Sequence, residues 1–319
     1  MTSKEEYLQI CARSTNIPIY SQHWWMEAVC AGKNWDVAIA HDSSGAVTAT
    51  LPYLFGQKFG QRYILMPPLT QTNGICFHYP TQFNERERLS FEKRWAKEII
   101  RQLDSLKIDL FVQNFSPAFS NWLPFYWSGF RQTTRYTYII NDLKNLETVF
   151  GNFSSAKQRQ IKKAERNRLI CKEGKMSPAE FYDFHKQLIE ERGGKEEIGR
   201  EPFLQLADAA IKRRQGAILS IEGADEKTQS ALFMVWDNER AYYLVPANDR
   251  GFSTTGAASL LVWEAVKKAA GHSKSFDFEG SMAESIENSY HQFGTHQTPY
   301  SEISKANSII AKLWLKMQR

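Results

Sequence analysis

Two carboxylates alternate with two phenylalanines in the segment 275–279, which we expect to form a β-strand. Because alternate side chains of a strand point to the same side, Phe276 and Phe278 would face the core. Asp277 and Glu279 would then lie together on the other side, about 7 Å apart by the rise of a strand. A carboxylate at the carboxyl end of a strand can act as a general base or bind an amine. The alternative is an edge strand whose carboxylates are solvated.

Two loops could present backbone N–H groups to an anion. Gly280 and Ser281 follow the expected strand as a turn that leaves room for a close backbone approach. The second loop runs from Asn248 to a helix expected over 256–269, and most of its residues are small. The first turn of a helix binds anions through its N–H groups, although capping by a hydroxyl of this loop explains the pattern equally well. Gly280, Ser281 and Asn248 are therefore candidate substrate-binding residues.

Four basic residues share one face of a helix that we expect over 155–169. Arg159, Lys162, Lys163 and Arg166 are spaced at i, i+3, i+4 and i+7. Like charges on one face repel each other, so helix stability does not explain them. A phosphate, a diphosphate, an RNA backbone or an acidic lipid would explain them, and all four are candidate substrate-binding residues. The alternative is a solvated face.

The charge of the chain is concentrated in this helix and its flanks. The 319 residues carry 40 basic and 35 acidic side chains, a net charge of +5. Residues 154–172 hold seven basic residues against one acidic residue, a net +6, so the remainder of the chain nets −1. The chain therefore lacks the general basicity of a nonspecific polyanion binder. Glutamates at 190–191 and 196–197 could neutralise part of the helix.

A polar loop over 67–74 is a further candidate site. It contains Pro67-Pro68 and is too long for a simple turn, and such loops often carry function. Gln71 and Asn73 have side-chain amides that could form hydrogen bonds with a substrate.

The sequence lacks the motifs of several common enzyme classes. It has no GxxxxGK[ST] phosphate loop, no HExxH zinc motif and no GxSxG nucleophile elbow. His291 and His296 have a spacing found in zinc sites, but no Cys pair supports them, so we predict no metal. No apolar run approaches the ~20 residues of a membrane span, and no apolar signal segment is found. We expect a cytoplasmic protein, with peripheral association at the inner membrane face as an alternative.

The expected elements fall into two similar sets. From about residue 155, the patterns predict helices, three strands, a helix, a strand, a helix, a strand and a helix. From about residue 22, the first half predicts the same order of strands and helices. A shared order suggests an ancient duplication. We therefore predict a mixed α/β chain of two domains, 1–145 and 146–319, each a mixed sheet flanked by helices.

Several segments of the second half form a combination that is more specific than any one of them alone. They are Asn152–Asn167, Ala241–Val245, Phe276–Met282, Tyr290–Gly294 and Pro299-Tyr300. Their combination resembles the FemAB/BioF2-like branch of the GNAT-fold acyltransferases. The similarity covers most of residues 150–305 and is thinner before them, where it rests on Trp24-Trp25 and the loop at 67–74.

The resemblance implies two GNAT-like domains in tandem and the transfer of an acyl or aminoacyl group to an amine, in cell-wall (peptidoglycan) or lipid metabolism. It implies no tightly bound cofactor, because the acyl donor is a co-substrate: acyl-CoA, acyl-carrier protein or aminoacyl-tRNA. Arg250–Ser253 departs from the Q/R-x-x-G-x-G/A loop that binds the pyrophosphate of CoA in acyl-CoA-dependent members. No long heptad segment matches the helical arm of some tRNA-dependent members. The donor, and tRNA as a partner, therefore stay open.

The resemblance also suggests roles for individual residues. Asp277 and Glu279, as a pair, would remove or relay the amine proton. Tyr290, Tyr243 and Tyr300 would position the substrate or protonate the leaving group, although aromatic packing explains each tyrosine taken singly. The basic helix would hold a phosphate-bearing donor or acceptor. The alternative function is a catalytically inactive GNAT-like module that binds RNA or an anionic membrane through the basic helix.

Overall fold

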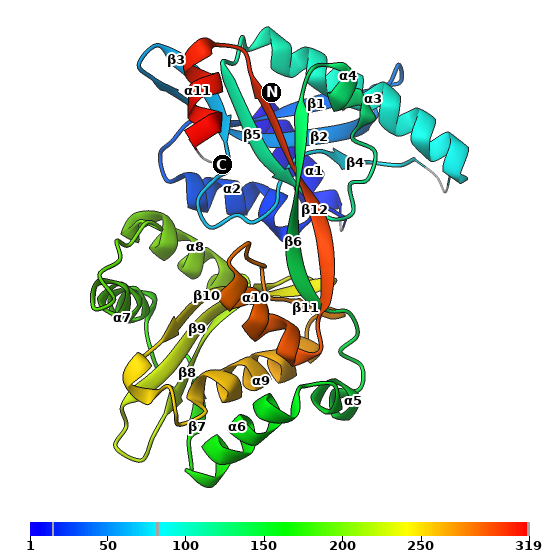
Figure 1. The fold of residues 1–319 in the computed structure, drawn as a ribbon. Helices are drawn as coiled ribbons and strands as arrows, with labels where there is room; N and C mark the ends of the chain where they lie inside the picture. The colour runs from blue at the N-terminus through cyan, green and yellow to red at the C-terminus, as the bar shows by residue number, and fades with distance from the viewer. Residues whose placement is uncertain (15, 81–82, 318–319) are drawn as a thin grey trace. The chain divides into compact units, whose positions relative to one another are not determined.

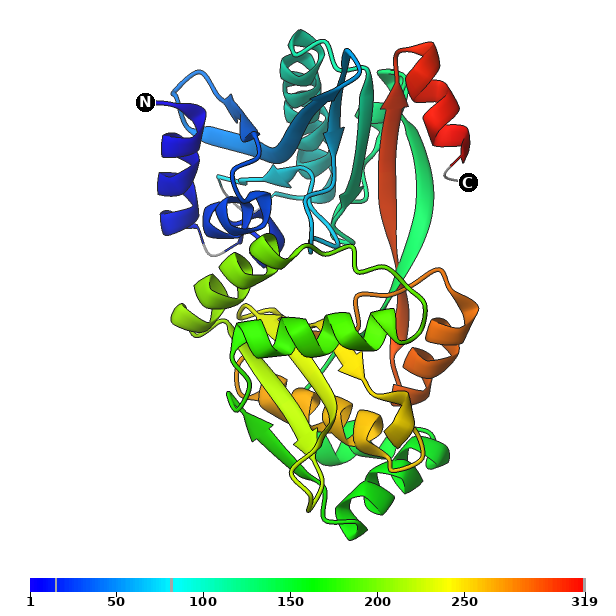
Figure 2. The ribbon, with the colours of Figure 1, turned by 90° about the vertical axis from the view of Figure 1, so that its left-hand side faces the viewer.

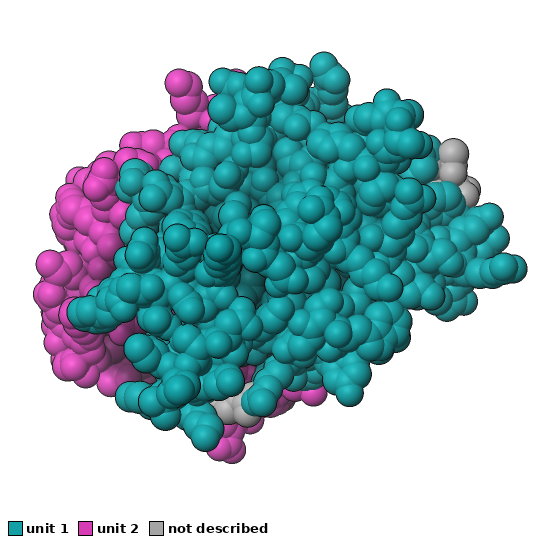
Figure 3. Space-filling view, turned by 90° about the horizontal axis from the view of Figure 1, so that it is seen from above, with its two compact units in different colours: residues 1–135, 299–319 teal, residues 136–298 magenta. Residues whose placement is uncertain are grey.

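The computed structural model describes residues 1–14, 16–80 and 83–317 of a chain that folds into two compact units. Unit 1 comprises Met1–Arg135 and Pro299–Arg319, and unit 2 comprises Tyr136–Thr298 (Figure 3). These units do not coincide with the predicted domains 1–145 and 146–319, because the segment from Pro299 onward returns to the unit that holds the N-terminus.

Two long strands account for this division. β6 (Arg131–Ile140) and β12 (His296–Ala306) each run from one unit into the other (Figure 1). In unit 1, β12 pairs with β5 (Leu110–Phe115), and in unit 2, β6 pairs with β11 (Ser275–Asp277). Both pairings are antiparallel. Part of β6, from the first half of the sequence, thus belongs to unit 2, and part of β12, from the second half, belongs to unit 1. The order of the elements along the chain does not reveal this exchange.

Unit 1 is built on a mixed sheet with the strand order β1-β2-β3-β5-β12, and β4 also pairs with β2. Its other elements are α1 (Ser3–Arg13), η1 (Ile19–Ser21), α2 (His23–Cys30), β1 (Trp35–His41), β2 (Val47–Lys58), β3 (Gln61–Leu65), β4 (Cys76–Phe77), α3 (Glu85–Ser105), α4 (Leu123–Trp127) and α11 (Ile309–Met317). β3 and β5 are parallel, and α3 connects them. A capping box of Asn84 and Glu87 begins α3, and Trp95, Ile99 and Leu103 on one side of it are buried in the core of unit 1.

Unit 2 has a sheet with the strand order β6-β11-β10-β9-β8-β7. Its other elements are α5 (Leu146–Gly151), α6 (Ser155–Arg166), β7 (Ile170–Glu173), α7 (Pro178–Glu190), α8 (Arg200–Lys212), β8 (Gly216–Glu222), β9 (Thr228–Trp236), β10 (Arg240–Asn248), η2 (Arg250–Phe252), α9 (Ala257–Ala270), α10 (Glu284–Tyr290) and η3 (His291–Phe293). Only β10 and β11 form a parallel pair among the strand pairs described for this sheet, and α9 is their crossover helix.

Helices cover both faces of the sheet of unit 2. Leu232 and Met234 of β9 are buried in one core cluster with residues of α6 and α9. Phe233, which points to the opposite side, contacts Phe203 of α8 with their ring centroids 5.4 Å apart. α6 and α9 therefore lie on one face, and α7 and α8 lie on the other (Figure 2).

Most of the elements expected from the sequence are present. The predicted helix starting at Ser177 begins with the expected capping box, in which Ser177 and Glu180 exchange hydrogen bonds with each other's backbone. Phe276 and Phe278 are buried in the core, as predicted. The predictions missed α1, β4, α5 and β7, which are short or have few apolar residues.

Candidate active site

The parallel strands β10 and β11 part at their carboxyl ends. They are paired over three residues only, up to Tyr242 and Asp277, where β11 ends. β10 continues to Asn248, and its pairing with β9 shifts register between Tyr242 and Val245. The predicted strand through Glu279 is therefore wrong, because the chain leaves the sheet two residues earlier. Glu279 thus lies in the turn that follows this opening in the sheet.

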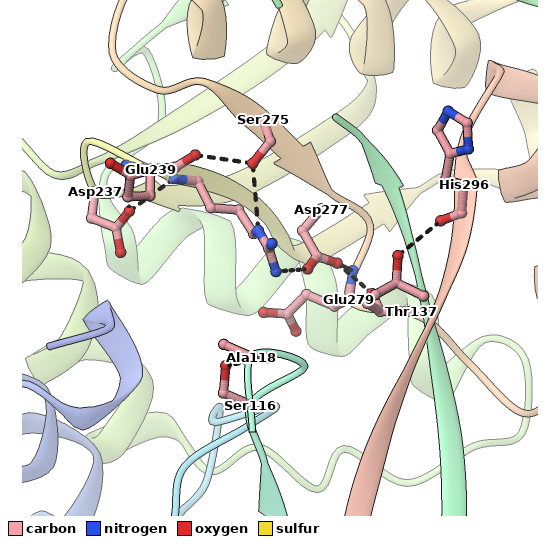
Figure 4. A network of polar contacts seen from close by, with 11 residues as sticks. Ser116, Ala118, Thr137, Asp237, Glu239, Ser275, Asp277, Glu279 and His296 are labelled. Atoms are coloured by element: carbon pink, nitrogen blue, oxygen red, sulfur yellow. Dashed lines mark hydrogen bonds and ion pairs between the residues drawn. The ribbon is translucent and has the colours of Figure 1, made fainter. Parts of the chain in front are cut away.

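Asp277 is 1% exposed, and its carboxylate accepts three hydrogen bonds (Figure 4). Oδ1 accepts from the Thr137 hydroxyl and from the Glu279 N–H at 2.8 Å, and Oδ2 accepts from Arg240 Nη1 at 3.2 Å. Arg240 Nε also donates to Ser275 Oγ at 3.4 Å. Burial raises the pKa of Asp277, and the Arg240 charge opposes that shift. Both carboxylate oxygens are engaged, so Asp277 holds the turn in place.

Glu279 has a left-handed backbone, with φ 63°, which is rare for a residue other than glycine and typical of functional sites. Gly280 shares this conformation, and a Cβ there would lie 2.1 Å from the Tyr136 carbonyl oxygen, so only glycine fits. Glu279 Oε1 is shielded from solvent, and burial raises the pKa of the carboxyl well above its ordinary value. Ser281 Oγ accepts from Ala283 N at 3.0 Å and forms the next turn. A partly buried carboxyl with a raised pKa is a candidate for proton transfer.

Aromatic rings adjoin this turn. The Tyr290 ring of α10 lies 4.9 Å from that of Phe278 and 6.3 Å from that of Tyr243, centroid to centroid. The pKa of Tyr290 is raised by burial first, then by Tyr243 and by the charge of Glu279. Burial raises the pKa of Tyr243 to about 12, against the effect of its hydrogen bond with Asn248. The structure thus brings four predicted residues, Tyr243, Asn248, Glu279 and Tyr290, into one neighbourhood.

Other residues of this neighbourhood were missed by the sequence analysis. The Tyr138 ring lies 6.3 Å from that of Tyr290, and its hydroxyl accepts a hydrogen bond from Gln297 Nε2 at 2.9 Å. Tyr138 and Thr137 belong to β6, which the sequence assigns to the first domain, so no local signal connected them with Asp277. A prediction that allowed the last strand of each half to pair with the sheet of the other half would have placed Thr137 and Tyr138 near Asp277.

Three predicted site residues have different surroundings, because they lie in unit 1. Asn73 is buried, and its Oδ1 accepts from Ser21 Oγ and from the next backbone N–H, both at 2.9 Å. The Gln71 carbonyl accepts from Asn114 Nδ2 at 3.0 Å. Tyr300 is also buried. Asn73 forms part of the wall of a pocket of about 380 Å³ in unit 1, and its amide stabilises the loop at 67–74.

A second pocket, of about 250 Å³, opens at the start of α9 in unit 2. Its wall contains three cations, Lys157, Arg192 and Arg250, and one carboxylate, Asp249. Asp249 Oδ1 accepts from the backbone N–H two residues later at 2.7 Å, and the Arg192 guanidinium donates to the carbonyl of Asn248. Because Asn248 also contacts Tyr243, this residue connects the pocket to the aromatic neighbourhood of Glu279. The pocket has the charge and helix terminus expected of an anion site.

Close packing of α6 on the start of α9 positions the cations of this pocket. Gly256 has φ 89°, and a Cβ there would lie 2.2 Å from the Gln160 carbonyl oxygen. Lys157, one turn earlier in α6, lines the pocket, and burial lowers its pKa. Its Nζ donates to Ser289 Oγ at 3.3 Å, in the helix that carries Tyr290. Lys157 was counted in the basic segment of the sequence but was not predicted as a site residue.

The predicted basic face of α6 is present and lies outside the pocket. Its residues are Arg159, Lys162, Lys163 and Arg166. All four are exposed, and none forms an ion pair with another residue that the structure describes. Glu190 pairs with a lysine of its own helix, and Glu196 accepts a hydrogen bond from a tyrosine, so neither neutralises the face. The charge of the basic face is therefore uncompensated.

Part of the chain matches the model of a known protein family. Residues 152–284 match the family model of the acetyltransferase (GNAT) domain. This part of the chain is a GNAT domain. It contains the parted strands β10 and β11, Glu279 and the pocket at α9. No curated protein matches the sequence.

Solved structures extend the fold to the whole chain. FemX is 12% identical with a TM-score of 0.71, and the alignment covers 100% of this chain and 99% of that one. The C-terminal domain of a putative lysylphosphatidylglycerol synthetase from Agrobacterium fabrum is 12% identical with a TM-score of 0.60, covering 98% and 96%. A tandem GNAT protein from the clavulanic acid pathway is 10% identical with a TM-score of 0.54, covering 96% and 95%. These similarities confirm the predicted tandem GNAT fold.

Within residues 1–14, 16–80 and 83–317, no group of three or more His, Cys, Asp or Glu side chains is placed to hold a metal ion. None of the helices in the described part of the chain is long and apolar enough to span a membrane.

Proposed function

We propose that this GNAT-fold protein is an N-acyltransferase that moves an activated acyl or aminoacyl group onto an amine of cell-wall or lipid metabolism. The observation that carries the proposal is the partly buried carboxyl of Glu279, whose Oε1 is shielded from solvent and which adjoins Tyr290 where β10 and β11 part. A structural glutamate would gain nothing from this burial, since burying a carboxylate away from water opposes folding. Proton transfer explains why the chain keeps a carboxylic acid there.

The pocket at the start of α9 supports a donor that carries phosphate. Lys157, Arg192 and Arg250 supply positive charge, and the first residues of α9, 257–259, line the same pocket. Acyl-CoA, acyl-carrier protein and aminoacyl-tRNA all carry phosphate, and in the first two a long pantetheine arm joins the phosphate to the activated acyl group. Asn248 and Lys157 connect this pocket to the tyrosines beside Glu279, so a donor bound by its phosphate would extend its acyl group toward the carboxyl.

The proposed reaction balances with the residues of this neighbourhood. Glu279, as the carboxylate, takes a proton from the amine as its nitrogen attacks the acyl carbon and the N–C bond forms. The bond from the acyl carbon to the leaving sulfur or oxygen breaks, and the hydroxyl of Tyr290 gives its proton to that atom. Glu279 then returns its proton to Tyr290, which restores both groups. The raised pKa of Tyr290 keeps the hydroxyl protonated until it is needed.

A ligand screen tests the donor. Acyl-CoA, acyl-carrier protein, aminoacyl-tRNA and nucleotide-linked wall precursors are each added to the full chain, and the melting temperature is recorded. A donor at 100 times its Kd stabilises the folded state by about 2.7 kcal/mol, which raises the melting temperature of a chain of this length by roughly 4 °C. We expect Lys157→Met to raise the KM for the donor about tenfold or more with little change in kcat, because it removes a cation from the pocket wall. Lys163→Met, on the exposed basic face, is the matched control, and an equal rise in its KM would contradict the assignment of the pocket.

The uncompensated basic face supports a second candidate function, a catalytically inactive module that binds RNA. A binder that neutralises several phosphates loses affinity steeply as salt rises. The acyltransferase would show turnover that depends on Glu279 at any salt concentration at which the donor binds. A salt titration of RNA binding, with Lys162→Gln/Lys163→Gln as the test variant, separates the two functions.

A further inference from the structure

The helix α11 in unit 1 carries an apolar stripe that nothing in the described chain covers. The exposed residues of the stripe are Ile309 (77%), Ile310 (58%), Leu313 (56%) and Met317 (86%). At 100° per residue they fall within an arc of about 100°. Ala311, on the opposite side of the helix, is buried against unit 1. Folding therefore does not account for the stripe, since exposed apolar surface of this kind marks an interaction site.

Positive charge lies along one border of the apolar stripe. Lys312 and Lys316 are exposed and line a pocket of about 370 Å³, together with Arg131 and Lys305. Lys305 pairs with Asp104 at 3.1 Å. The other three cations form no ion pair with residues that the structure describes, and no carboxylate of these residues lines the pocket. The pocket is large enough for a small anionic group and has the charge to bind one.

An exposed aromatic residue lies close to the start of α11. Phe59, at the tip of the β2–β3 turn, is 88% exposed and has φ 51°, a backbone conformation that disfavours a bulky side chain. The turn is next to the helix, because the Ser308 hydroxyl donates to Gln61 Oε1 (Figure 1). Lys58 lies over the Phe59 ring, 5.4 Å from its centroid. Neither burial nor turn geometry explains a phenylalanine at this tip.

We propose that α11 docks unit 1 on an anionic lipid bilayer. The apolar stripe enters the boundary between headgroups and acyl chains, while Lys312 and Lys316 extend to lipid phosphates and the cationic pocket holds one headgroup. A second copy of the chain is a poorer occupant, because it would bring three more uncompensated cations to the same place. This docking surface is separate from the GNAT site and from the basic face of α6, and it does not rest on the proposed acyl transfer.

Vesicle co-sedimentation of the full chain tests this surface. We expect binding to vesicles of equimolar phosphatidylcholine and phosphatidylglycerol, and little binding to phosphatidylcholine alone. Each lysine near an anionic membrane strengthens binding about fivefold, so Lys312→Gln/Lys316→Gln lowers the affinity about 25-fold. Leu313→Ser/Met317→Ser lowers it at constant charge, because apolar insertion is lost. Phe59→Ser weakens it less. The melting temperature of each variant shows that the fold is kept.

Matched controls decide between this surface and its rivals. Lys162→Gln/Lys163→Gln removes the same charge from α6 and leaves vesicle binding nearly unchanged if α11 is the docking surface. The proposal is overturned if that control loses binding and the α11 variants keep it, or if both vesicle types bind equally. Competition by millimolar inorganic phosphate that abolishes binding would show a site for a free anion instead. A dimer in sedimentation velocity that Leu313→Ser/Met317→Ser dissociates, without vesicle binding by the parent chain, would assign the stripe to a second copy.

Discussion

We expect the replacement of Glu279 by glutamine to change activity and stability in opposite directions. Glutamine keeps the size of the side chain but cannot accept the amine proton, so we expect the transfer rate to fall by about 10²–10⁴-fold, the usual contribution of a general base. This corresponds to a barrier increase of about 3–5 kcal/mol. In the proposed mechanism the base works as the carboxylate, so we expect the activity of the parent chain to rise with pH through the raised pKa of Glu279.

The stability change follows from the same raised pKa. The folded state holds the Glu279 proton at pH values where the unfolded chain, with an ordinary carboxyl pKa near 4.5, has released it. The folded state therefore binds more protons, and the free energy of unfolding falls as pH rises from about 4.5 to the folded pKa, by ~1.4 kcal/mol per pH unit. Glutamine has no charge to bury. Glu279→Gln is thus expected to gain stability relative to the parent at pH 8 and to show little gain at pH 5.

The assay combines urea unfolding at both pH values with single-turnover transfer from the donor found by the ligand screen. Glu284→Gln, an exposed glutamate five residues later, is the matched control and should change neither quantity. Full transfer activity of Glu279→Gln would refute the role of base. An equal stability change at pH 5 and pH 8 would refute the argument from burial.

Two further substitutions separate positioning from chemistry. Asp277→Asn removes the carboxylate that faces Arg240 and is expected to lower the free energy of unfolding by about 1–3 kcal/mol. We expect it to reduce the transfer rate per folded molecule less than Glu279→Gln does. Urea unfolding and transfer rates measure the two effects, and a larger loss of transfer at unchanged stability would make Asp277 the base. Gly280→Ala places a Cβ 2.1 Å from a backbone carbonyl oxygen and should lower the free energy of unfolding by about 2–4 kcal/mol. Gly193 also has a positive φ but has open space around it, so Gly193→Ala should lower that free energy by about 1 kcal/mol. Equal values for the two variants in urea unfolding would contradict the close approach at Gly280.

Local sequence patterns predicted several of the helices and site residues described above. The capping box at Ser177 and the spacing of the basic residues on α6 depend on neighbours within one helix, so they could be read directly from the sequence. Glu279 was also identified from its local segment. The strand that was expected to place it beside Asp277 ends at Asp277, so the alternation of strand side chains does not extend to Glu279.

Contacts between residues that are far apart in the sequence could not be predicted. Thr137 binds the carboxylate of Asp277, and they are 140 residues apart. Lys157 lines the anion pocket because Gly256 lets α6 approach the start of α9, and only the packed structure shows that approach. Ordinary side chains gain their roles here from tertiary contacts, which leave no periodic signal in the chain.

The exchange of strands changes what the two halves of the sequence mean for function. β6 follows the first set of elements in sequence, yet in unit 2 it pairs with β11 and supplies Thr137 and Tyr138. These residues hold Asp277 and adjoin Tyr290, and Asp277 in turn holds the backbone of Glu279 at 2.8 Å. A boundary drawn near residue 145 would therefore separate the GNAT site from its own supports. The compact unit that holds Glu279 begins at Tyr136, within β6, so the contacts around Glu279 include residues from both of the sequence halves 1–145 and 146–319.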